Sequence, residues 1–147
     1  MAIGEFEGFR YGMDWRAELA PDWTFRSLII ERTDGARLEL SCDAGRWTMN
    51  GQPAPQFAGC IDIDISATPF TNTLPIRRVK FEIGVPQRFN MAWVPLDSLE
   101  PFVDGQIYTK LDDTHFRYEA ADGSFTQVLT IDEHGFVVVY PTLYRRL

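Results

Sequence analysis

The segment Cys60–Ile65, which reads Cys-Ile-Asp-Ile-Asp-Ile, is the most informative part of the sequence for the fold. Successive side chains of a β-strand point to opposite faces, so its isoleucines share one face and Cys60, Asp62 and Asp64 share the other. A second run, Phe136–Tyr140, is apolar throughout and is typical of a strand covered on both sides. A curved sheet with a packed outer face and an enclosed inner face explains both runs. An ordinary β-sandwich whose edge directs the two aspartates at water explains them equally.

Turn signals built on Asp and Gly divide the rest of the chain into strand-length pieces. Besides these two runs, strands are predicted at Phe25–Arg32, Arg37–Cys42, Arg46–Met49, Arg88–Val94, Gln106–Leu111, His115–Glu119 and Phe125–Ile131. Helix is expected only in short pieces, around Leu96–Phe102 or just after Thr71. No internal repeat, low-complexity tract or linker interrupts the pattern. The sequence therefore predicts one mainly β, antiparallel domain over residues 1–147, with residues 1–9 as a poorly ordered N-terminal extension.

Composition limits the functions that the chain can serve. Its 147 residues are 45% hydrophobic, which is enough for a core without a disulfide scaffold. The formal net charge of −7 excludes nucleic acid as the favoured partner, because a phosphate backbone attracts basic proteins. Aromatic residues make up 14% of the chain, as 11 Phe, 5 Tyr and 4 Trp. So many rings predict a β-rich core or a surface that receives an apolar ligand.

Targeting and metal-binding signals are lacking in the chain as given. No apolar run approaches the roughly 18 residues that a membrane span needs, and the first residues lack the basic and apolar regions of a secretory signal. We therefore expect a soluble, cytoplasmic protein. Cys42 and Cys60 have neither metal-ligand nor Cys-x-x-Cys spacing, so we expect buried free thiols. No cofactor and no metal ligand is predicted.

The densest chemistry lies between Cys60 and Arg78. Asp62 and Asp64 are same-face neighbours about 7 Å apart, a separation that suits the acid and base of a glycosidase. Clustered oxygens also suit Mg²⁺ or Ca²⁺. A third explanation pairs the two aspartates with Arg77, Arg78 or backbone amides and orders an irregular loop. We favour this structural explanation, because arginine–carboxylate pairs hold their geometry well.

Aromatic side chains alternate onto single faces of three predicted strands. The three rows are Phe89, Met91 and Trp93; Phe116 and Tyr118; and Phe136, Val138 and Tyr140. If these faces converge, they line a space with apolar walls and a few polar groups, which suits an amphiphile. The same rows could instead fill a solid core, as side chains do in small β-barrels. The sequence leaves both alternatives open.

The run Gly59–Arg78 closely resembles the signature of the Putative glycolipid-binding family of bacterial proteins. It combines a Cys-Ile-Asp-Ile-Asp core with the tail Thr-Pro-Phe-Thr-Asn-Thr-Leu-Pro-Ile-Arg-Arg. Further stretches that resemble the family are Asp22-Trp23 with Arg26, Trp47 with Gly51, Gln106–Thr109, Phe116–Glu119, Ile131–Asp132, Gly135–Val138 and Tyr140–Pro141. The resemblance spans roughly residue 10 to the C-terminus.

This resemblance implies a fold: a strongly curved antiparallel sheet that forms an incomplete β-barrel, like those of periplasmic lipoprotein carriers, with one or two short helices. Family members carry further strands before the Asp-Trp segment, whereas about twenty residues precede Asp22. We therefore expect the family's first strands to be missing. An uncovered edge strand invites pairing with another chain, so we expect a homodimer through that edge or a swapped strand, which a monomeric mass by light scattering would contradict.

The resulting functional hypothesis is a non-enzymatic binding protein for an apolar or amphiphilic small molecule, with a glycolipid implied by the resemblance. An aromatic concave sheet would hold the apolar part, and polar groups would meet the head group. The expected ligand-binding residues are Asp62, Asp64, Asn72, Arg77, Arg78, Trp93, Tyr108, Tyr118 and Tyr140. One alternative is a small hydrolase or metal-dependent enzyme that uses Asp62 and Asp64. Another is a protein-interaction module that uses the uncovered sheet edge.

Overall fold

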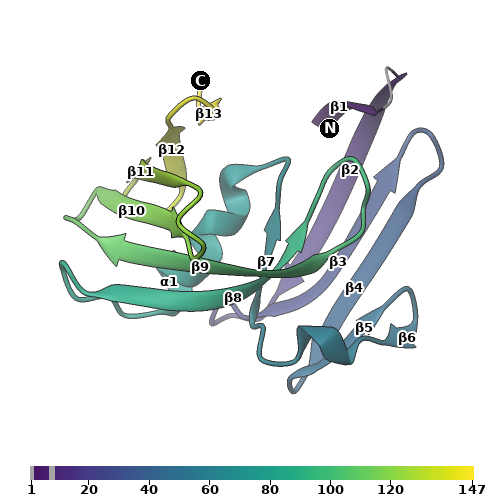
Figure 1. Ribbon diagram of the computed structural model, residues 1–147, viewed down its shortest axis with the longest axis horizontal. Helices are drawn as coiled ribbons and strands as arrows, with labels where there is room; N and C mark the ends of the chain where they lie inside the picture. Colours follow the sequence, from purple (N-terminus) through teal and green to yellow (C-terminus); the bar gives the residue numbers. More distant parts are fainter. Residues whose placement is uncertain (1, 7–8) are drawn as a thin grey trace.

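The computed structural model describes the backbone of residues 2–6 and 9–147, and the side chains from residue 11 onward. The described strands form two sheets (Figure 1). The N-terminal sheet is an antiparallel meander in which each strand pairs with the next along the chain. Its strands are β1 (Ala2–Phe6), β2 (Phe9–Leu19), β3 (Phe25–Arg32), β4 (Arg37–Asp43), β5 (Arg46–Met49) and β6 (Gln52–Pro53).

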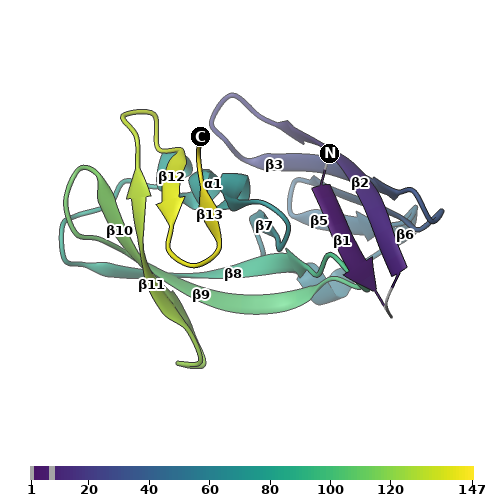
Figure 2. The same cartoon turned by 90° about the horizontal axis from the view of Figure 1, so that it is seen from above.

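The C-terminal sheet has the order β13-β12-β11-β10-β9-β8-β7. Its strands are β7 (Asp62–Ile65), β8 (Pro86–Val94), β9 (Phe102–Lys110), β10 (His115–Ala120), β11 (Thr126–Ile131), β12 (Val137–Tyr140) and β13 (Tyr144–Arg145). Three short helical segments complete the described structure: η1 (Pro55–Phe57), η2 (Pro69–Asn72) and α1 (Thr73–Arg78). The C-terminal sheet curls around α1 as a half-barrel (Figures 1 and 2), so the predicted fold class is confirmed.

One pair of strands departs from the predicted antiparallel pattern. β7 pairs with β8 in parallel, with Asp62 beside Met91 and Asp64 beside Trp93. Parallel neighbours need a crossover between them. Here the connection from residue 66 to residue 85 supplies it and contains η2 and α1. The crossover therefore brings the helical segments onto the sheet, on the side toward which it curls.

The alternation in β7 separates two clusters. Ile63 and Ile65 are fully buried in a core that also contains Leu28 and Leu40 of the N-terminal sheet. Asp62 is only 1% exposed and lies on the opposite face. The sandwich alternative, in which the aspartates face water, is therefore wrong, because the sheet curls over that face.

A second cluster fills part of the concave side of the C-terminal sheet. Its buried members are Met91, Tyr108, Phe116, Tyr118, Leu129, Ile131, Val137 and Tyr140. Ile76 of α1 packs against them, so the helix occupies the inside of the half-barrel. The three aromatic rows converge only in part: Phe89, Met91, Phe116, Tyr118 and Tyr140 meet here, whereas Phe136 packs against Phe70 and Trp23 outside this cluster. One part of the space that they enclose is a filled core, and another part is the pocket described below.

Most predicted strand boundaries agree with the structure to within a few residues, and helix α1 begins two residues after Thr71, as expected. The helix expected around Leu96–Phe102 is wrong. Leu96 lies in a turn, Leu99 has a left-handed φ of 52°, and β9 begins at Phe102. Strands β1, β2, β6 and β13 were not among those predicted.

The predicted N-terminal extension includes residues 1, 7 and 8, which lie outside the described residues. The segment Ala2–Phe6 pairs with β2 as strand β1. Strands β1 and β6 end the N-terminal sheet, and β13 and β7 end the C-terminal sheet. Pairing of such a strand with a second chain stays a prediction. Within the described part of the chain, no helix is long and apolar enough to cross a membrane, and both cysteines are free thiols, with Cys60 buried and Cys42 half-buried.

Candidate ligand-binding pocket

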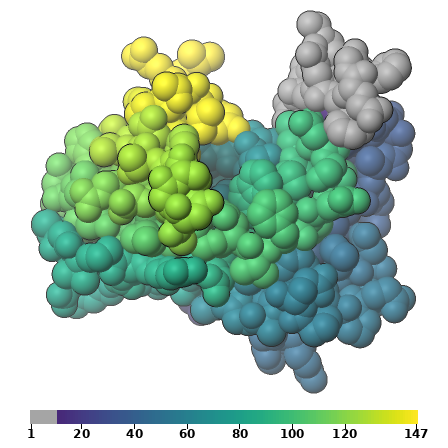
Figure 3. Space-filling model, viewed as in Figure 1, coloured from purple at the N-terminus to yellow at the C-terminus, as the bar shows by residue number. Residues whose placement is uncertain are grey.

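An open pocket of about 310 Å³ lies on the concave side of the C-terminal sheet. Figure 3 shows the surface hollowed between the C-terminal segment and the β8–β9 region. Each strand of this sheet except β11 contributes to the wall, and so do the segments after β7 and β10. The lining residues are Asp64, Ile65, Ser66, Thr68, Asn72, Trp93, Phe102, Asp104, Tyr118, Ala120, Asp122, Ser124, Phe125, Tyr140, Leu143 and Tyr144.

Rings in mutual contact form one wall of the pocket. The Tyr118 ring lies 5.9 Å from Phe125 and 6.4 Å from Tyr140, between ring centroids, and Tyr140 lies 6.1 Å from Tyr144. The Tyr144 hydroxyl donates a hydrogen bond of 2.7 Å to the carbonyl of Ser66, which fastens the C-terminal segment to the chain after β7. Burial raises the pKa of Tyr118 and Tyr140, so both remain neutral hydroxyls at physiological pH.

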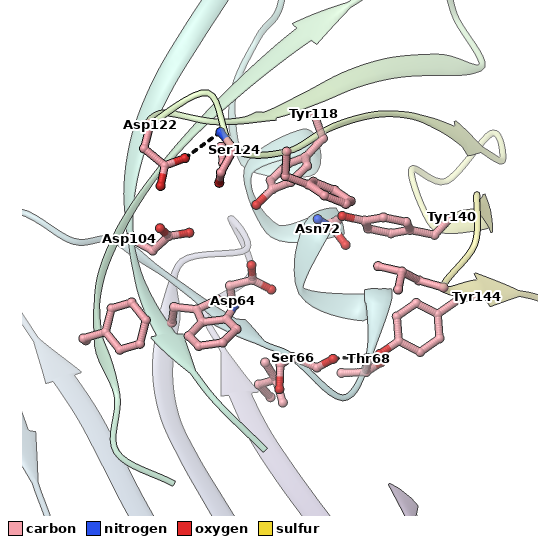
Figure 4. Close-up of a pocket in the computed structure, with 16 residues that line it drawn as sticks. Asp64, Ser66, Thr68, Asn72, Asp104, Tyr118, Asp122, Ser124, Tyr140 and Tyr144 are labelled. Atoms are coloured by element: carbon pink, nitrogen blue, oxygen red, sulfur yellow. Dashed lines mark hydrogen bonds between the residues drawn. The ribbon is translucent and has the colours of Figure 1, made fainter. Parts of the chain in front are cut away.

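The carboxylates gather at the other side. Figure 4 shows Asp104 and Asp122 opposite Tyr140 and Tyr144, with Asp64 between the two groups. The strand registers explain why Asp64 and Asp104 lie close together. Trp93 on β8 pairs with Asp64 on one side and Phe102 on the other, and Asp104 follows Phe102 by two positions on the same face.

A chain of buried hydrogen bonds fixes two of these carboxylates. The Gln106 amide nitrogen donates to Asp64 at 2.6 Å and to Asp104 at 3.2 Å, and its oxygen accepts from the Tyr108 hydroxyl at 3.3 Å. The Asn72 amide donates in turn to that hydroxyl at 2.9 Å. Ionised carboxylates only accept hydrogen bonds, so each donor in this series of hydrogen bonds points in the direction of the two aspartates. The aspartates are thereby held as acceptors at the pocket wall.

Asp64 and Asp122 have opposite electrostatic surroundings. Burial raises the pKa of Asp64, although hydrogen bonds from Gln106 and from the Thr71 hydroxyl at 2.8 Å partly offset this effect. Asp122 is exposed, and its carboxylate accepts a hydrogen bond of 2.9 Å from the backbone amide of Ser124 (Figure 4). Hydrogen bonds from the side chain and from the backbone amide of Ser124 lower the pKa of Asp122, which is therefore charged at neutral pH.

Asp62 lies on the same face of β7 as Asp64 but belongs to a different site. Its two oxygens accept hydrogen bonds from the Arg78 guanidinium, at 3.2 Å from Nε and 2.5 Å from Nη2. Burial still raises the pKa of Asp62, the contact with Arg78 acting in the opposite direction. This pair lines a neighbouring hollow together with Arg88 and Asn90. The expected pairing of Asp62 with an arginine is confirmed, whereas Asp64 is held by neutral donors.

Arg77 points away from both of these sites. Its Nη1 donates to the carbonyl of His134 at 2.8 Å, and its guanidinium lies 4.9 Å above the Trp23 ring. It therefore joins α1 to the turn between β11 and β12 and to the N-terminal sheet. Adjacent positions on a short helix point in different directions, which separates Arg77 from Arg78.

The expected ligand-binding residues divide into two groups. Those that line the pocket are Asp64, Asn72, Trp93, Tyr118 and Tyr140. Tyr108 is buried behind the wall, and Asp62, Arg77 and Arg78 lie elsewhere. Sequence reasoning missed the contribution of Asp104, Asp122, Phe125 and Tyr144 to the wall. Asp104 could have been found from its same-face spacing to Gln106 and Tyr108, but the other three join the pocket only through the curl of the sheet.

The described part of the chain contains no cluster of side chains arranged to bind a metal ion. Among the side chains that the structure describes, from residue 11 onward, no group of three or more from His, Cys, Asp or Glu is placed to hold a metal ion. Asp62 and Asp64 each have protein partners instead, as given above.

Comparison with known proteins identifies the family. The sequence profile of the family described as Putative glycolipid-binding matches residues 1–146. The chain belongs to this family. Its half-barrel fold and its membership of the family both fit a binding role.

A solved structure supports the family's fold for this chain. A DUF1089 family protein from Pseudomonas aeruginosa, known from a crystal structure at 1.80 Å resolution, superposes with a TM-score of 0.90 at 39% sequence identity. The match covers 98% of this chain and 82% of the Pseudomonas chain. No curated protein matches the chain.

Proposed function

We propose that this protein binds an amphiphilic small molecule, of the glycolipid class that the family description names, without transforming it. The observation that carries the proposal is the open pocket of about 310 Å³, in which a wall of rings faces a group of carboxylates. Apolar walls with a few oriented polar groups are what small-molecule sites require. The polar end of the ligand would meet Asp64, Asn72, Asp104 and Asp122, and its apolar part would lie on Trp93, Tyr118, Phe125 and Tyr140.

Neighbouring surfaces supply room for an apolar chain. A second hollow of about 360 Å³ is lined mainly by apolar side chains, including Phe70, Phe136 and Val138, and it shares Thr68 and Tyr144 with the pocket. Arg145 and Arg146 also line this second hollow. A ligand whose polar end occupies the pocket therefore has apolar surface close by. This arrangement supports an amphiphile over a wholly polar ligand.

The rim supports the same conclusion. Phe102 and Leu143 line the pocket and yet remain 51% and 55% exposed. Large apolar side chains left in water beside a cavity often mark a binding site for an apolar group. An apolar chain that leaves the pocket would cover one of them.

The test is a lipid extraction of the purified protein, followed by mass spectrometry of the extract. We expect a co-purifying amphiphile, and we expect the wild-type protein to bind dodecyl maltoside in calorimetry. Ala120→Phe should abolish both, because Ala120 lines the pocket and a phenyl ring there would occupy it. Protein that is repeatedly empty and binds no lipid probe would refute the proposal.

Glu119→Phe provides the matched control. Glu119 is the neighbour of Ala120 on β10, so its side chain points to the other face of the sheet. The two variants add the same ring at adjacent positions, and only one of them fills the pocket. Equal loss of binding in both would show that the effect does not come from the pocket. Thermal melting checks that each variant is folded.

A further inference from the structure

The pocket contains carboxylates but no basic side chain. Asp64, Asp104 and Asp122 are among its sixteen described lining residues, and none of the sixteen is Lys, Arg or His. The two arginines of the signature segment are engaged elsewhere, Arg78 by Asp62 and Arg77 by the carbonyl of His134. An anionic head group in the pocket would therefore meet like charges without a counter-charge.

The hydrogen bonds of the wall leave acceptors for the ligand. The Gln106 amide already donates hydrogen bonds to Asp64 and Asp104, and the Thr71 hydroxyl donates one to Asp64. A carboxylate has about four acceptor positions and can only accept, so the remaining positions need donors from the ligand. Hydroxyl groups supply such donors, whereas phosphate and sulfate esters ionised at neutral pH do not.

Neutral hydroxyls and flat rings complete the wall. Ser66, Thr68, Ser124, Tyr118 and Tyr140 bring side-chain hydroxyls to the lining, each of which can donate as well as accept. A sugar hydroxyl also does both, and a pyranose ring has an apolar face of C–H bonds that suits an aromatic side chain. A quaternary ammonium group is attracted by carboxylates and by aromatic faces, but it can neither donate a hydrogen bond to the carboxylates nor accept one from these hydroxyls.

We propose that the pocket selects an uncharged polyhydroxyl head group and rejects a phosphate, sulfate or carboxylate head group. This inference rests on the proposed function and adds the charge class of the ligand. Asp104 and Asp122 are the specificity-determining residues, because both face the pocket and neither is paired with a basic group there. Asp64 assists them from the end of the buried hydrogen-bond chain.

The experiment compares three probes that have the same alkyl chain: dodecyl maltoside, dodecyl phosphate and dodecyltrimethylammonium. Each is titrated into the wild-type protein by calorimetry, below its micelle concentration and at low ionic strength. We expect dodecyl maltoside to bind, and dodecyl phosphate to bind at least about tenfold more weakly. Added salt should strengthen the binding of dodecyl phosphate and leave that of dodecyl maltoside unchanged, because salt screens the repulsion.

Two variants test which charges are responsible. Asp104→Asn should reduce the difference in binding affinity between dodecyl maltoside and dodecyl phosphate, because it removes one carboxylate charge and keeps an acceptor oxygen. Asp43→Asn removes the same charge from the hairpin between β4 and β5, where the side chain is 84% exposed, and should leave the difference as it is. The salt dependence of the wild type gives an answer even if Asp104→Asn does not fold.

The outcomes separate this inference from the proposed function. Dodecyl phosphate or dodecyltrimethylammonium binding as tightly as dodecyl maltoside would overturn the charge selectivity, while the amphiphile-binding function would stand. Equal effects of Asp104→Asn and Asp43→Asn would overturn the assignment of selectivity to the pocket. Binding of none of the three probes would overturn the proposed function, and this inference with it.

Discussion

Asp62 and Asp64 lie two positions apart on β7, and their partners give them different roles. Asp62 forms an ion pair with Arg78 in which the carboxylate is 1% exposed and the guanidinium side chain 16% exposed. Asp64 is held by Thr71 and Gln106, which are neutral, and it faces the pocket. The first aspartate therefore orders the chain around α1, and the second is a candidate ligand contact.

Asp62→Asn should destabilise the protein by about 3 kcal/mol, because it leaves the Arg78 guanidinium buried without its counter-charge. Chemical denaturation measures the change. The double variant Asp62→Leu with Arg78→Met should recover much of the loss, since well-packed apolar residues often replace a buried ion pair without penalty. Asp43→Asn, which breaks an exposed pair with Arg46 at 3.8 Å, should change stability by less than about 1 kcal/mol. A fully stable Asp62→Asn protein would contradict the structural role.

The turn between β11 and β12 is the element that connects α1 to the sheet ends. Gly135 in this turn has a left-handed φ of 82°. A β-carbon placed there would lie 3.1 Å from Cδ of Arg77 and 3.3 Å from Cγ2 of Ile76. The position therefore needs glycine both for its backbone conformation and for the close approach of α1.

Gly135→Ala should lower the free energy of unfolding by more than Gly45→Ala. Gly45 provides the matched control, because its φ of 80° gives the same backbone strain and no atom lies within 4 Å of the added β-carbon. We expect about 1 kcal/mol for the strain that both share, and a further loss at Gly135 from the contact with Arg77. Equal losses of unfolding free energy at the two positions would show that α1 accommodates the added β-carbon without a loss of stability.

At the level of the whole molecule, the described aspartates with shifted pKa values fall into two groups of opposite sign. Hydrogen bonds lower the pKa of aspartates in turns, such as the exposed Asp112 and the half-buried Asp132. Burial raises the pKa of Asp62 and Asp64. The stability supplied by the first group is present above the unfolded pKa of 3.8 and is lost as the pH falls through the folded values. For Asp62 and Asp64 the folded state favours the protonated carboxyl, so the stability that they supply is present below pH 3.8. It is lost as the pH rises through their folded pKa values.

An NMR titration of the aspartate carboxyl carbons should therefore give midpoints above 3.8 for Asp62 and Asp64 and below 3.8 for Asp112 and Asp132. Asp132→Asn tests the link to stability. Its carboxylate accepts from the backbone amides of His134 and Phe136 and from Arg146 at 2.7 Å. The difference in stability between wild type and variant should shrink as the pH falls below 3.8, and a constant difference would contradict the assignment.

Strand content followed from local patterns. The alternation in β7 and the Asp-Gly turns predicted most strands, since side-chain direction in a strand depends only on backbone geometry. Strand β2 carries the same signal, with Tyr11, Met13 and Trp15 directed at the core, and a stricter count of alternation would have found it. The expected helix at Leu96–Phe102 failed because a turn with a left-handed residue breaks that segment.

The pocket could be predicted only in part. Asp64, Tyr118 and Tyr140 were expected ligand contacts from their rows, and all three line it. The role of Gln106 was not foreseen, because it joins Asp64 across 42 positions of sequence. Nor could the sequence choose between Arg77 and Arg78 as the partner of Asp62, since that choice depends on the direction of α1.

Local sequence patterns were enough to establish a mainly β chain, the division of β7 into an apolar and an acidic face, and a segment that combines carboxylates with two adjacent arginines. These properties follow from alternation and composition, which need no knowledge of distant partners. The tertiary structure alone decided that Asp104 and Asp122 join Asp64, and that both arginines turn away from them. The physical reason is that strand register and the curl of the sheet set distances between residues far apart in sequence, and those distances decide which charges meet.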